Sequence, residues 1–174
     1  MDNAEVRDWI DFAGKCCGIH SLNDLIDIKW SNRMTRAKGT ACFYRFGKRH
    51  VIKLSRPLFA RDDYDGNANT VIHEACHIID GVLNGRMDGH GDRWRGYMVK
   101  CGQTPERCHS VDNTGLAKRW VYECPGCGHE FNVSTVLRNK IARGSRRVCK
   151  GCRTVFDHDA YKGPALQRAA QDGN

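Results

Sequence analysis

Residues 69–80 read NTVIHEACHIID and place two histidines four positions apart, with a glutamate directly after the first, in an otherwise apolar run. Burying an unpaired carboxylate or imidazole costs on the order of several kcal/mol, comparable to what one core side chain contributes. A hydrophobic core alone therefore does not explain this segment. We expect a bound group that compensates His73, Glu74 and His77.

The apolar residues around this segment recur at helical spacing and predict a helix over about residues 70–83. Residues four apart on a helix lie on the same face, roughly 6 Å from each other, so His73 and His77 can direct a ring nitrogen at one metal ion. Glu74 then stands beside the first ligand, where it can accept a proton from a zinc-bound water instead of binding the metal. The alternative is a pair of hydrogen-bonded core histidines, which leaves Glu74 without a role.

A catalytic zinc needs a third protein ligand and an open position for water. His90 follows the helix after a glycine-rich segment and precedes the residues GDRW, where another helix is expected to begin. This position allows His90 to fold back toward the two helical histidines, so we expect it to be the third ligand. Asp88 and Asp92 are the alternatives, because zinc sites also accept a carboxylate as the third ligand.

The rest of the N-terminal region predicts further helices and a small sheet. Helical spacing is found near residues 4–14 and 22–28, and another helix is expected over 92–102. The β-rich runs GTACFYRF and HVIKLSRPLF, joined by a short turn, predict a hairpin over about 39–55. The candidate helix caps and stop signals are Ser21, Asn67, Asn69, Gly81, Gly85 and Asp92.

Two CxxC pairs in the C-terminal third form the second strong pattern. The run CPGC provides Cys124 and Cys127, and the run CKGC provides Cys149 and Cys152. Paired knuckles with glycine in each turn are typical of a four-cysteine zinc ribbon, whose metal is structural. His129 is close enough in sequence to compete, but four thiolates already complete a tetrahedral site. Four ordinary buried cysteines are the alternative.

Positive charge is concentrated around these cysteines. Residues 1–116 contain 17 Lys and Arg against 15 Asp and Glu, whereas residues 117–153 contain nine against two. Dense positive charge favours phosphate backbones, and aromatic side chains can stack on unpaired bases, so we expect DNA as a partner. The alternative is a solvated basic face with the aromatic residues in the ribbon core. The candidate DNA-contacting residues are Arg138, Lys140, Arg143, Arg146, Arg147, Lys150, Arg153, Trp120 and Tyr122.

These residues resemble the SprT-like metallopeptidases, a family that includes bacterial SprT proteins and the metazoan Spartan proteases. The resemblance lies in HEACH, in GHGDRWRGYM after a spacer, and in the preceding WSNRMTRAKGTACFYR and VIKLSRPLF, and it covers about residues 20–156. It implies a compact, zincin-like α+β fold in which the HExxH helix lies beside a small β-sheet. It also implies that His73, His77 and His90 bind zinc and that Glu74 is the general base.

Length and composition suit this interpretation. The chain has 174 residues, and we expect a SprT-like domain over 1–116, a zinc ribbon over 117–156 and a flexible tail over 157–174. The first 20 residues lack the apolar centre of a secretory signal, and no apolar run is long enough to predict a membrane span. We therefore expect an intracellular protein, cytoplasmic or nucleoid-associated, whose ten cysteines are reduced or bound to zinc.

The pattern and the resemblance together predict a zinc-dependent endopeptidase that binds a catalytic and a structural Zn²⁺. By resemblance to Spartan, its substrates would be proteins bound or crosslinked to DNA. The sequence shows no ubiquitin-binding or sliding-clamp-binding motif, so we expect no recruitment through those partners. Two other functions stay open. One is a zinc peptidase that acts on a dedicated protein without nucleic acid, and the other is a non-catalytic DNA-binding zinc protein, which the intact Glu74 disfavours.

Some roles are not assigned by the sequence. Tyr97, Arg107 or His109 could stabilise the oxyanion that forms when a peptide carbonyl is attacked, and linear sequence does not choose among them. The six cysteines outside the ribbon are interpreted as small buried hydrophobic residues. A third metal site formed by Cys101, Cys108 and His109 is the alternative for part of this set.

Overall fold

The computed structural model of the chain describes residues 1–106 and 111–165. The chain divides into two compact units, Met1–Asn113 and Thr114–Asn174. Each unit has its own cluster of buried hydrophobic residues, so each is a separate folded body.

Three strands form the sheet of the first unit, and they are β1 (Ile26–Ser31), β2 (Gly39–Cys42) and β3 (His50–Ser55). β3 lies in the centre, parallel to β1 and antiparallel to β2. The hairpin predicted over 39–55 is therefore confirmed. Of the two pairings, only that of β2 with β3 joins strands that are consecutive in sequence, so the pairing of β1 with β3 depends on contacts between more distant segments.

The helix predicted over residues 22–28 is wrong. Leu22–Leu25 form a short 3-10 turn, η1, and the chain then enters β1. Ile26, Ile28 and Trp30 alternate with more polar residues and contribute to the hydrophobic core, which is the two-residue period of a strand. Pairing with β3 along the whole strand provides the backbone hydrogen bonds that a helix would have supplied.

In the described part of the first unit, four α-helices complete the fold, and they are α1 (Asn3–Cys16), α2 (Arg56–Phe59), α3 (Tyr64–Asn84) and α4 (Asp92–Lys100). The helices predicted near 4–14, 70–83 and 92–102 correspond to α1, α3 and α4. α3 begins earlier than predicted, because the side chain of Asp63 caps it by accepting a hydrogen bond from the backbone N–H of Gly66.

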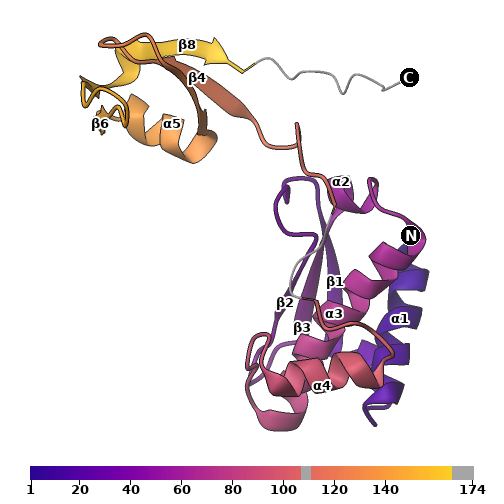
Figure 1. Cartoon of the computed structure of the whole chain (residues 1–174). Helices are drawn as coiled ribbons and strands as arrows, with labels where there is room; N and C mark the ends of the chain where they lie inside the picture. The colour runs from indigo at the N-terminus through magenta and orange to yellow at the C-terminus, as the bar shows by residue number, and fades with distance from the viewer. Residues whose placement is uncertain (107–110, 166–174) are drawn as a thin grey trace, which may run out of the picture. The chain divides into compact units, whose positions relative to one another are not determined.

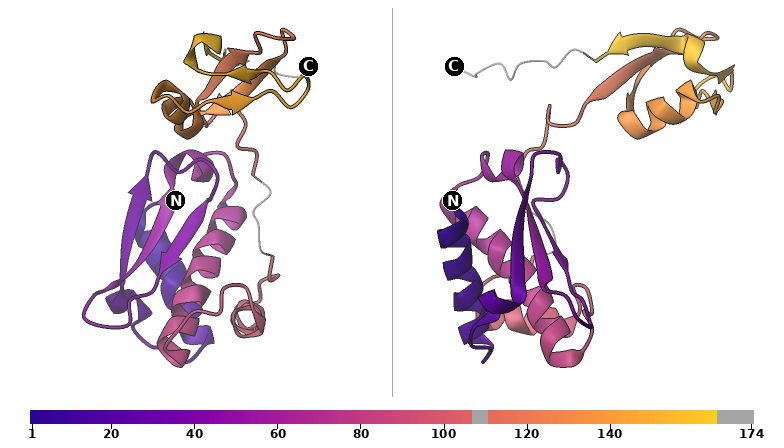
Figure 2. Two further views of the ribbon diagram at one scale, coloured as in Figure 1. Left: turned by 90° about the vertical axis from the view of Figure 1, so that its left-hand side faces the viewer. Right: turned by 180° about the vertical axis from the view of Figure 1, so that it is seen from behind.

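The core of the first unit lies between the sheet and the helices α1 and α3, which run along one face of the sheet (Figures 1 and 2). Ile52 and Leu54 of β3 and Val71 and Ile72 of α3 are fully buried in it. Gly81 of α3 lacks a side chain at a place that the ring of Phe43 occupies. Of the two glycines predicted as helix stops, Gly85, with a positive φ of 72°, ends α3, and Gly81 lies inside the helix.

The second unit is a small β-structure with one helix. It consists of β4 (Arg119–Glu123), β5 (Glu130–Ser134), α5 (Thr135–Ala142), β6 (Arg147–Val148), β7 (Val155–Phe156), η2 (His158–Ala160) and β8 (Tyr161–Pro164). β4 is the central strand between β5 and β8, and β6 pairs with β7 as a separate hairpin.

The prediction of a flexible tail from residue 157 onward is wrong for the described part of that segment. η2 and β8 belong to the ribbon unit, and β8 pairs antiparallel with β4, which places Tyr161 opposite Tyr122. Tyr161 and Ala160 also pack in the hydrophobic core of this unit. A small ribbon has few core residues, so it uses this last strand to complete its sheet. Residues 166–174 lie outside the described part of the chain.

The predicted α+β class is confirmed, with small sheets, a histidine cluster beside the helices and a four-cysteine cluster in the C-terminal unit. None of the helices in the described ranges has both the length and the apolar character required to cross a membrane. Cys76 and Cys101 are buried in the core, as predicted, whereas Cys42 is exposed at the end of β2. Cys108 lies outside the described residues.

Candidate metal centres

Three histidines from two parts of the first unit converge. His73 and His77 lie one turn apart on α3, and His90 lies in the loop just before α4. The Nε2 atoms of His73 and His90 are 3.0 Å apart, and the ring centroids of His77 and His90 are 4.8 Å apart. One possible ligand atom from each ring lies within 4.8 Å of the other two. The third member of this cluster is thus His90 rather than Asp88 or Asp92.

Glu74 follows His73 on α3 and is almost completely shielded, with 6% of its surface exposed. Its side chain lies against the beginning of β2, where a Cβ atom added to Gly39 would be 2.7 Å from Oε1 of Glu74. Burial raises the pKa of Glu74 to about 8. A cation bound at the histidines would favour the ionised carboxylate and oppose this shift. The absence of a side chain at Gly39 leaves the space that Glu74 occupies.

Trp94 of α4 packs against all three histidine rings and is fully buried. Its ring stacks on that of His77 at an angle of 17°, and the centroids of His73 and His90 are 4.7 and 4.6 Å away. The indole N–H donates a hydrogen bond to the backbone carbonyl of His73 at 3.3 Å. The sequence alone assigned no role to Trp94. Its position four residues after His90, in the helix expected to follow, was the signal that could have placed it near the histidines.

The environment keeps two of the histidines neutral. Burial, followed by the positive charge that His77 and His90 can acquire, lowers the pKa of His73 to about 3. Burial and His90 lower the pKa of His77 to about 4. Metal ions bind neutral imidazole, so these rings have no proton to release when a metal binds at neutral pH.

Two backbone groups orient these rings. His73 forms a hydrogen bond with the backbone of Glu106, beyond α4, and His77 forms one with the backbone of Gly89, before α4. Both bonds favour the protonated ring and oppose the larger effect of burial on the pKa. A metal-binding histidine commonly donates its second N–H to a carbonyl, which sets the tautomer and the direction of the ring. Segments on both sides of α4 therefore hold the two helical histidines in place.

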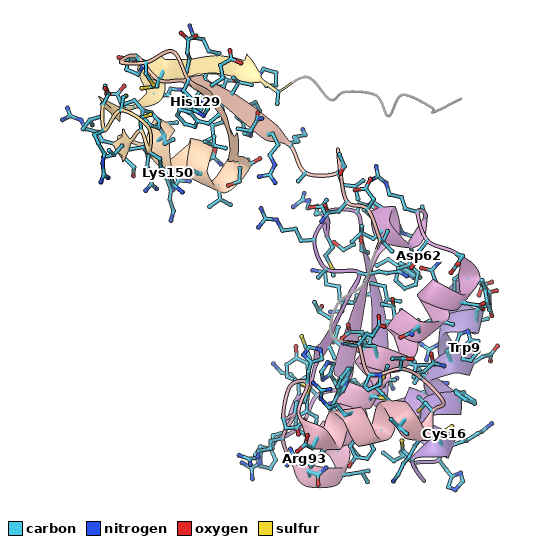
Figure 3. The ribbon with its side chains drawn as sticks, viewed as in Figure 1. Trp9, Cys16, Asp62, Arg93, His129 and Lys150 are labelled. Atoms are coloured by element: carbon cyan, nitrogen blue, oxygen red, sulfur yellow. The ribbon has the colours of Figure 1, made fainter. Side chains whose placement is uncertain are left out.

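Asp80 anchors the loop that contains His90. It is fully buried on α3, and its Oδ2 accepts a hydrogen bond from the backbone N–H of Asp88 at 2.6 Å. Its Oδ1 accepts a hydrogen bond at 2.7 Å from Nε of Arg93, which Figure 3 shows on α4. Although burial acts in the opposite direction, the bonds from Arg93 and from the backbone of Asp88 hold the pKa of Asp80 below its ordinary value. Sequence reasoning did not identify this network.

The other residues considered for this site have different surroundings. Asp88 Oδ2 accepts a hydrogen bond from the backbone N–H of Arg93 near the start of α4, and Asp92 is exposed in the first turn of that helix. Both carboxylates lie where a helix N-terminus favours negative charge. The hydroxyl of Tyr97 accepts a hydrogen bond from Asn84 at 3.0 Å. Arg107 and His109 lie outside the described residues.

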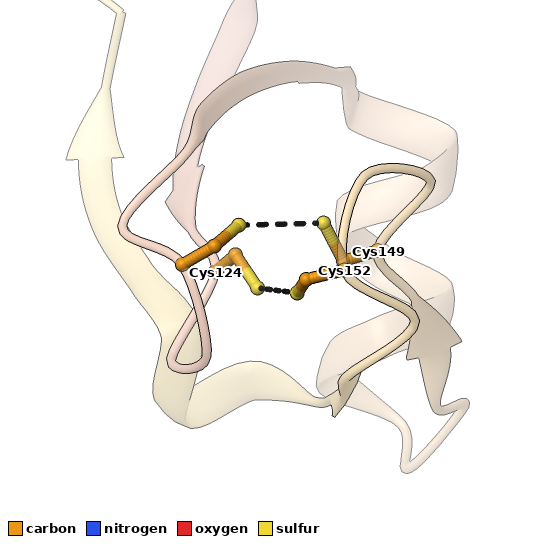
Figure 4. Close-up of side chains that lie close together, drawn as sticks. Cys124, Cys149 and Cys152 are labelled. Atoms are coloured by element: carbon orange, nitrogen blue, oxygen red, sulfur yellow. Dashed lines mark hydrogen bonds between the residues drawn. The ribbon is translucent and has the colours of Figure 1, made fainter.

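Four cysteines of the second unit converge from two facing turns (Figure 4). The sulfur of Cys124 is 3.4 Å from that of Cys152, and the sulfur of Cys127 is 3.8 Å from that of Cys149. All four sulfur atoms lie within 4.8 Å of one another. Hydrogen bonding with Thr154 lowers the pKa of Cys152 to about 6, which favours the thiolate form that binds metals. The predicted four-cysteine cluster is therefore present.

The first cysteine turn is held by its own backbone. The N–H of Cys124 donates to the carbonyl of His129 at 2.9 Å, and the N–H of Gly128 donates to the carbonyl of Cys124 at 2.9 Å. The N–H of Gly126 lies 3.4 Å from the sulfur of Cys124. The ring of His129 is exposed and stacks on Phe131, so among the described residues it is not part of the cysteine cluster (Figure 3).

Comparison with known proteins identifies the first unit. The model of the SprT-like family matches residues 12–114, more than half of the chain. The chain belongs to the SprT-like family. Protein SprT of Pseudomonas fluorescens strain Pf-5 is 30% identical over 110 residues, which cover 62% of this chain and 67% of that protein. Human germ cell nuclear acidic protein is 30% identical over 141 residues, which cover 76% of this chain but 19% of that much longer protein.

A third relative matches most of this SprT-like chain. Protein SprT of Vibrio atlanticus strain LGP32 is 26% identical over 147 residues, which cover 82% of this chain and 87% of that protein. The family resemblance found in the sequence is thus confirmed. The match to the family model ends at residue 114, where the second unit begins. The family assignment therefore rests on the first unit and not on the ribbon.

The basic residues predicted to contact DNA lie mainly on the surface of the ribbon unit of this SprT-like protein. Lys140, Arg143, Arg146, Lys150 and Arg153 are exposed, whereas Arg138 and Arg147 are partly buried. Figure 3 shows Lys150 in this unit. The exposed side chains remain candidates for contacts with phosphate groups.

The two aromatic candidates in the ribbon differ. The prediction that Tyr122 stacks on a base is wrong, because Tyr122 is fully buried and its hydroxyl is 2.9 Å from Nδ1 of His158. Trp120 is partly buried, and its N–H donates to the hydroxyl of Thr135 at 3.0 Å. The guanidinium of Arg138 lies 4.4 Å from the centre of the Trp120 ring, so it already covers part of that ring.

Proposed function

We propose that this SprT-like protein is a zinc-dependent endopeptidase that associates with DNA and cleaves proteins bound or crosslinked to it. The observation that supports the reaction is the convergence of His73, His77 and His90, with the buried Glu74 beside them on α3. The association with DNA is supported by the exposed positive charge of the ribbon.

The two donor sets fit zinc in different ways. Three imidazole ligands leave a fourth position open, which suits a catalytic ion, whereas four thiolates complete a structural site. Tetrahedral ligands bound at about 2.0–2.1 Å from zinc are roughly 3.3 Å apart. The Nε2 atoms of His73 and His90, at 3.0 Å, are already close to that spacing.

The residues of the first unit have distinct tasks in the proposed reaction. When bound by the histidines, zinc supplies a Lewis acid that lowers the pKa of a water molecule and polarises the peptide carbonyl. Glu74 accepts a proton from the attacking water and returns it to the leaving nitrogen. Trp94 restricts the histidine rings, and Asp80 holds the loop that contains His90.

The DNA component follows from electrostatics. Residues 117–153 contain nine Lys and Arg and two acids, and five of the cations named above are exposed. Phosphate groups bind such surfaces with release of counterions, so the proposed affinity falls as salt rises. A protein held on DNA would then be presented to the peptidase through a shared scaffold, at a high local concentration.

The test is cleavage of a small basic DNA-binding protein with and without DNA. We expect cleavage by the zinc-loaded wild type that increases in the presence of DNA. Glu74→Gln should retain both metals and the fold but lose cleavage, because it removes the base and no ligand. Equal cleavage without DNA would favour a peptidase that acts independently of nucleic acid. DNA binding without any cleavage would favour a non-catalytic protein.

A further inference from the structure

Positive charge in the first unit is concentrated in the segment that forms its sheet. Residues 26–55 contain eight Lys and Arg and one acid, Asp27, whereas the rest of residues 1–116 contains nine Lys and Arg and 14 acids. Seven of the eight cations are exposed, and the eighth, Lys38, is buried. The small net charge of residues 1–116 thus conceals a basic surface on the sheet.

Two of these cations are neighbours on the face of the sheet opposite the helices. Lys29 of β1 is aligned with Lys53 of β3 in the parallel register, and both are exposed. Ile28 and Ile52, the preceding residues of the two strands, pack in the core, so the lysines point away from it. Among the described residues neither lysine forms an ion pair with a carboxylate. Like charges side by side repel, and a bound anion would relieve that repulsion.

The connection between β2 and β3 adds exposed aromatic rings to this basic region. Residues 43–49 read FYRFGKR, and all of them except the first are exposed. Phe46 is 82% exposed and Tyr44 is 38% exposed. The guanidinium of Arg45 lies 5.7 Å from the centre of the Phe46 ring, and the ammonium of Lys48 lies 5.9 Å from that of Tyr44. Exposed rings beside cations are the groups that unpaired nucleotides engage.

The base of this hairpin is attached to the helix of the histidine cluster. The ring of Phe43 fills the place left by Gly81, one turn after His77 on α3. The backbone N–H of Tyr44 also donates a hydrogen bond to Nδ1 of His50 at 3.2 Å. The exposed tip therefore projects from a well-packed base near the C-terminal part of α3.

We propose that this surface is a second binding site for nucleic acid, specific for single strands. Lys29, Lys53 and Lys48 contact phosphate groups, and Phe46 stacks on an unpaired base. Arg49 is not included, because it forms an ion pair with Asp27 at 2.7 Å. This inference rests on the proposed association with DNA and places one DNA contact on the same unit as the histidine cluster.

Single strands fit this surface better than duplexes or proteins. A duplex keeps the faces of its bases stacked, so it offers no ring to Phe46, whereas a single strand does. A specific protein partner usually requires an apolar, fully desolvated centre. The open face of the sheet instead presents Lys29, Lys53 and the exposed Thr40.

The test measures binding, and it uses the full chain, loaded with zinc and inactivated by Glu74→Gln. The probe is a labelled oligothymidylate of about 20 nucleotides, longer than the site of one small binding module. Phe46→Ala should weaken binding about tenfold without changing its salt dependence, because stacking involves no counterions. Combined Lys29→Ala, Lys48→Ala and Lys53→Ala should reduce the slope of log affinity against log salt by about 2.

Matched controls lie on the helices of the same unit. Phe12 is a 39% exposed aromatic residue on α1, and Lys15 and Lys100 are exposed cations on α1 and at the end of α4. Phe12→Ala, and Lys15→Ala combined with Lys100→Ala, should leave both affinity and salt slope unchanged. Thermal unfolding of each variant verifies that the substitutions do not act through stability. A DNA duplex of equal length tests whether binding requires a single strand. An oligouridylate of equal length tests whether the surface distinguishes RNA from DNA.

The outcomes separate this inference from the proposed function. If the sheet variants bind like the parent while ribbon variants lose affinity, the second site is overturned and the association with DNA is retained. If the parent itself does not bind, both are overturned. If the sheet variants bind DNA normally but raise the KM for a peptide in the active chain, the surface binds protein, which also overturns the inference. A wild type that binds DNA but cleaves nothing contradicts only the peptidase.

Discussion

Nε of Arg93 lies 2.7 Å from Oδ1 of Asp80, and this ion pair joins α4 to α3 on either side of the loop that contains His90. Asp80 is fully buried, and its other oxygen accepts the backbone N–H of Asp88 within the same loop. The third histidine is therefore positioned by two charged side chains that are not members of the histidine cluster.

Loss of this ion pair should affect both stability and metal binding. Arg93→Ala leaves the buried Asp80 carboxylate without its cation, so we expect the free energy of unfolding to fall. Zinc affinity at the histidines should fall roughly 10-fold to 100-fold, as is typical when a group that orients ligands is removed. Urea denaturation and zinc release to a chelator measure the two effects.

Arg86→Ala is the control, because Arg86 is an exposed cation in the same loop. It should change stability by less than about 0.5 kcal/mol and leave zinc affinity unchanged. Unaltered zinc affinity in Arg93→Ala would show that the loop holds His90 without the ion pair.

The second prediction concerns the number of bound metals. His90→Ala should reduce bound zinc from about two per chain toward about one, because three protein ligands are needed at a catalytic site and the cysteine site is separate. Asp88→Ala is the comparison, since Asp88 is near His90 in sequence but is outside the histidine cluster. It should retain both ions. Elemental analysis of the purified variants decides between the two residues, and the reverse result would make Asp88 the ligand.

The third prediction concerns the pH dependence of the metal-free protein. The pKa of Glu74 rises from its ordinary value of 4.5 to about 8 on folding, so the folded state binds more protons between these values. The contribution of Glu74 to the free energy of unfolding should therefore fall as pH rises through this window, by up to about 1.4 kcal/mol per pH unit. Glu74→Gln removes this dependence on pH. Near pH 8 the metal-free variant should therefore be more stable than the metal-free wild type.

Urea denaturation of the chelator-treated proteins across this window measures the difference. His73 and His77 have lowered pKa values of about 3 and 4, so they destabilise the folded state as pH falls below their ordinary value of 6.5. That effect is common to both proteins and cancels in the comparison. Identical profiles for wild type and Glu74→Gln would mean that Glu74 is ionised in the folded, metal-free state.

The fourth prediction concerns the ribbon surface. Combined Arg143→Ala, Arg146→Ala and Lys150→Ala should reduce the slope of log affinity against log salt by about 2 to 3, since all three residues are exposed. Arg147 is omitted because it is partly buried. Lys162→Ala is the control, because Lys162 already pairs with Glu123 at 2.8 Å. Cleavage of a peptide in the absence of DNA should be unchanged, and an unchanged salt slope would indicate a solvated surface without phosphate contacts.

The sequence predicted those features that depend on local periodicity. The spacing of His73 and His77 located the helix and two of the three clustered histidines, and the paired CxxC runs located the cysteine cluster. β1 was not predicted, because the residues Leu22, Leu25 and Ile26 also fit helical spacing and the partner strand is remote in sequence. Pairing with β3 overrode that local pattern.

The supporting residues of the site were missed for a related reason. Trp94, Asp80 and Arg93 have recognisable roles only when α4 is known to pack against α3. Likewise, the sequence does not reveal that Tyr122 is in the small core of the ribbon rather than on its surface. The roles of these residues depend on how helices and strands pack against one another. The periodicity of residues within one helix or strand does not predict that packing.

The bond between His73 and the backbone of Glu106 has a practical consequence for dissecting this protein. The last helix of the first unit, α4, ends at Lys100, which makes that residue the obvious place to cut the chain. A fragment ending there would keep all three histidines but lose the backbone group that orients the first of them. A fragment that keeps this contact must therefore extend through Glu106, and a graft of a different C-terminal module should be joined beyond that residue.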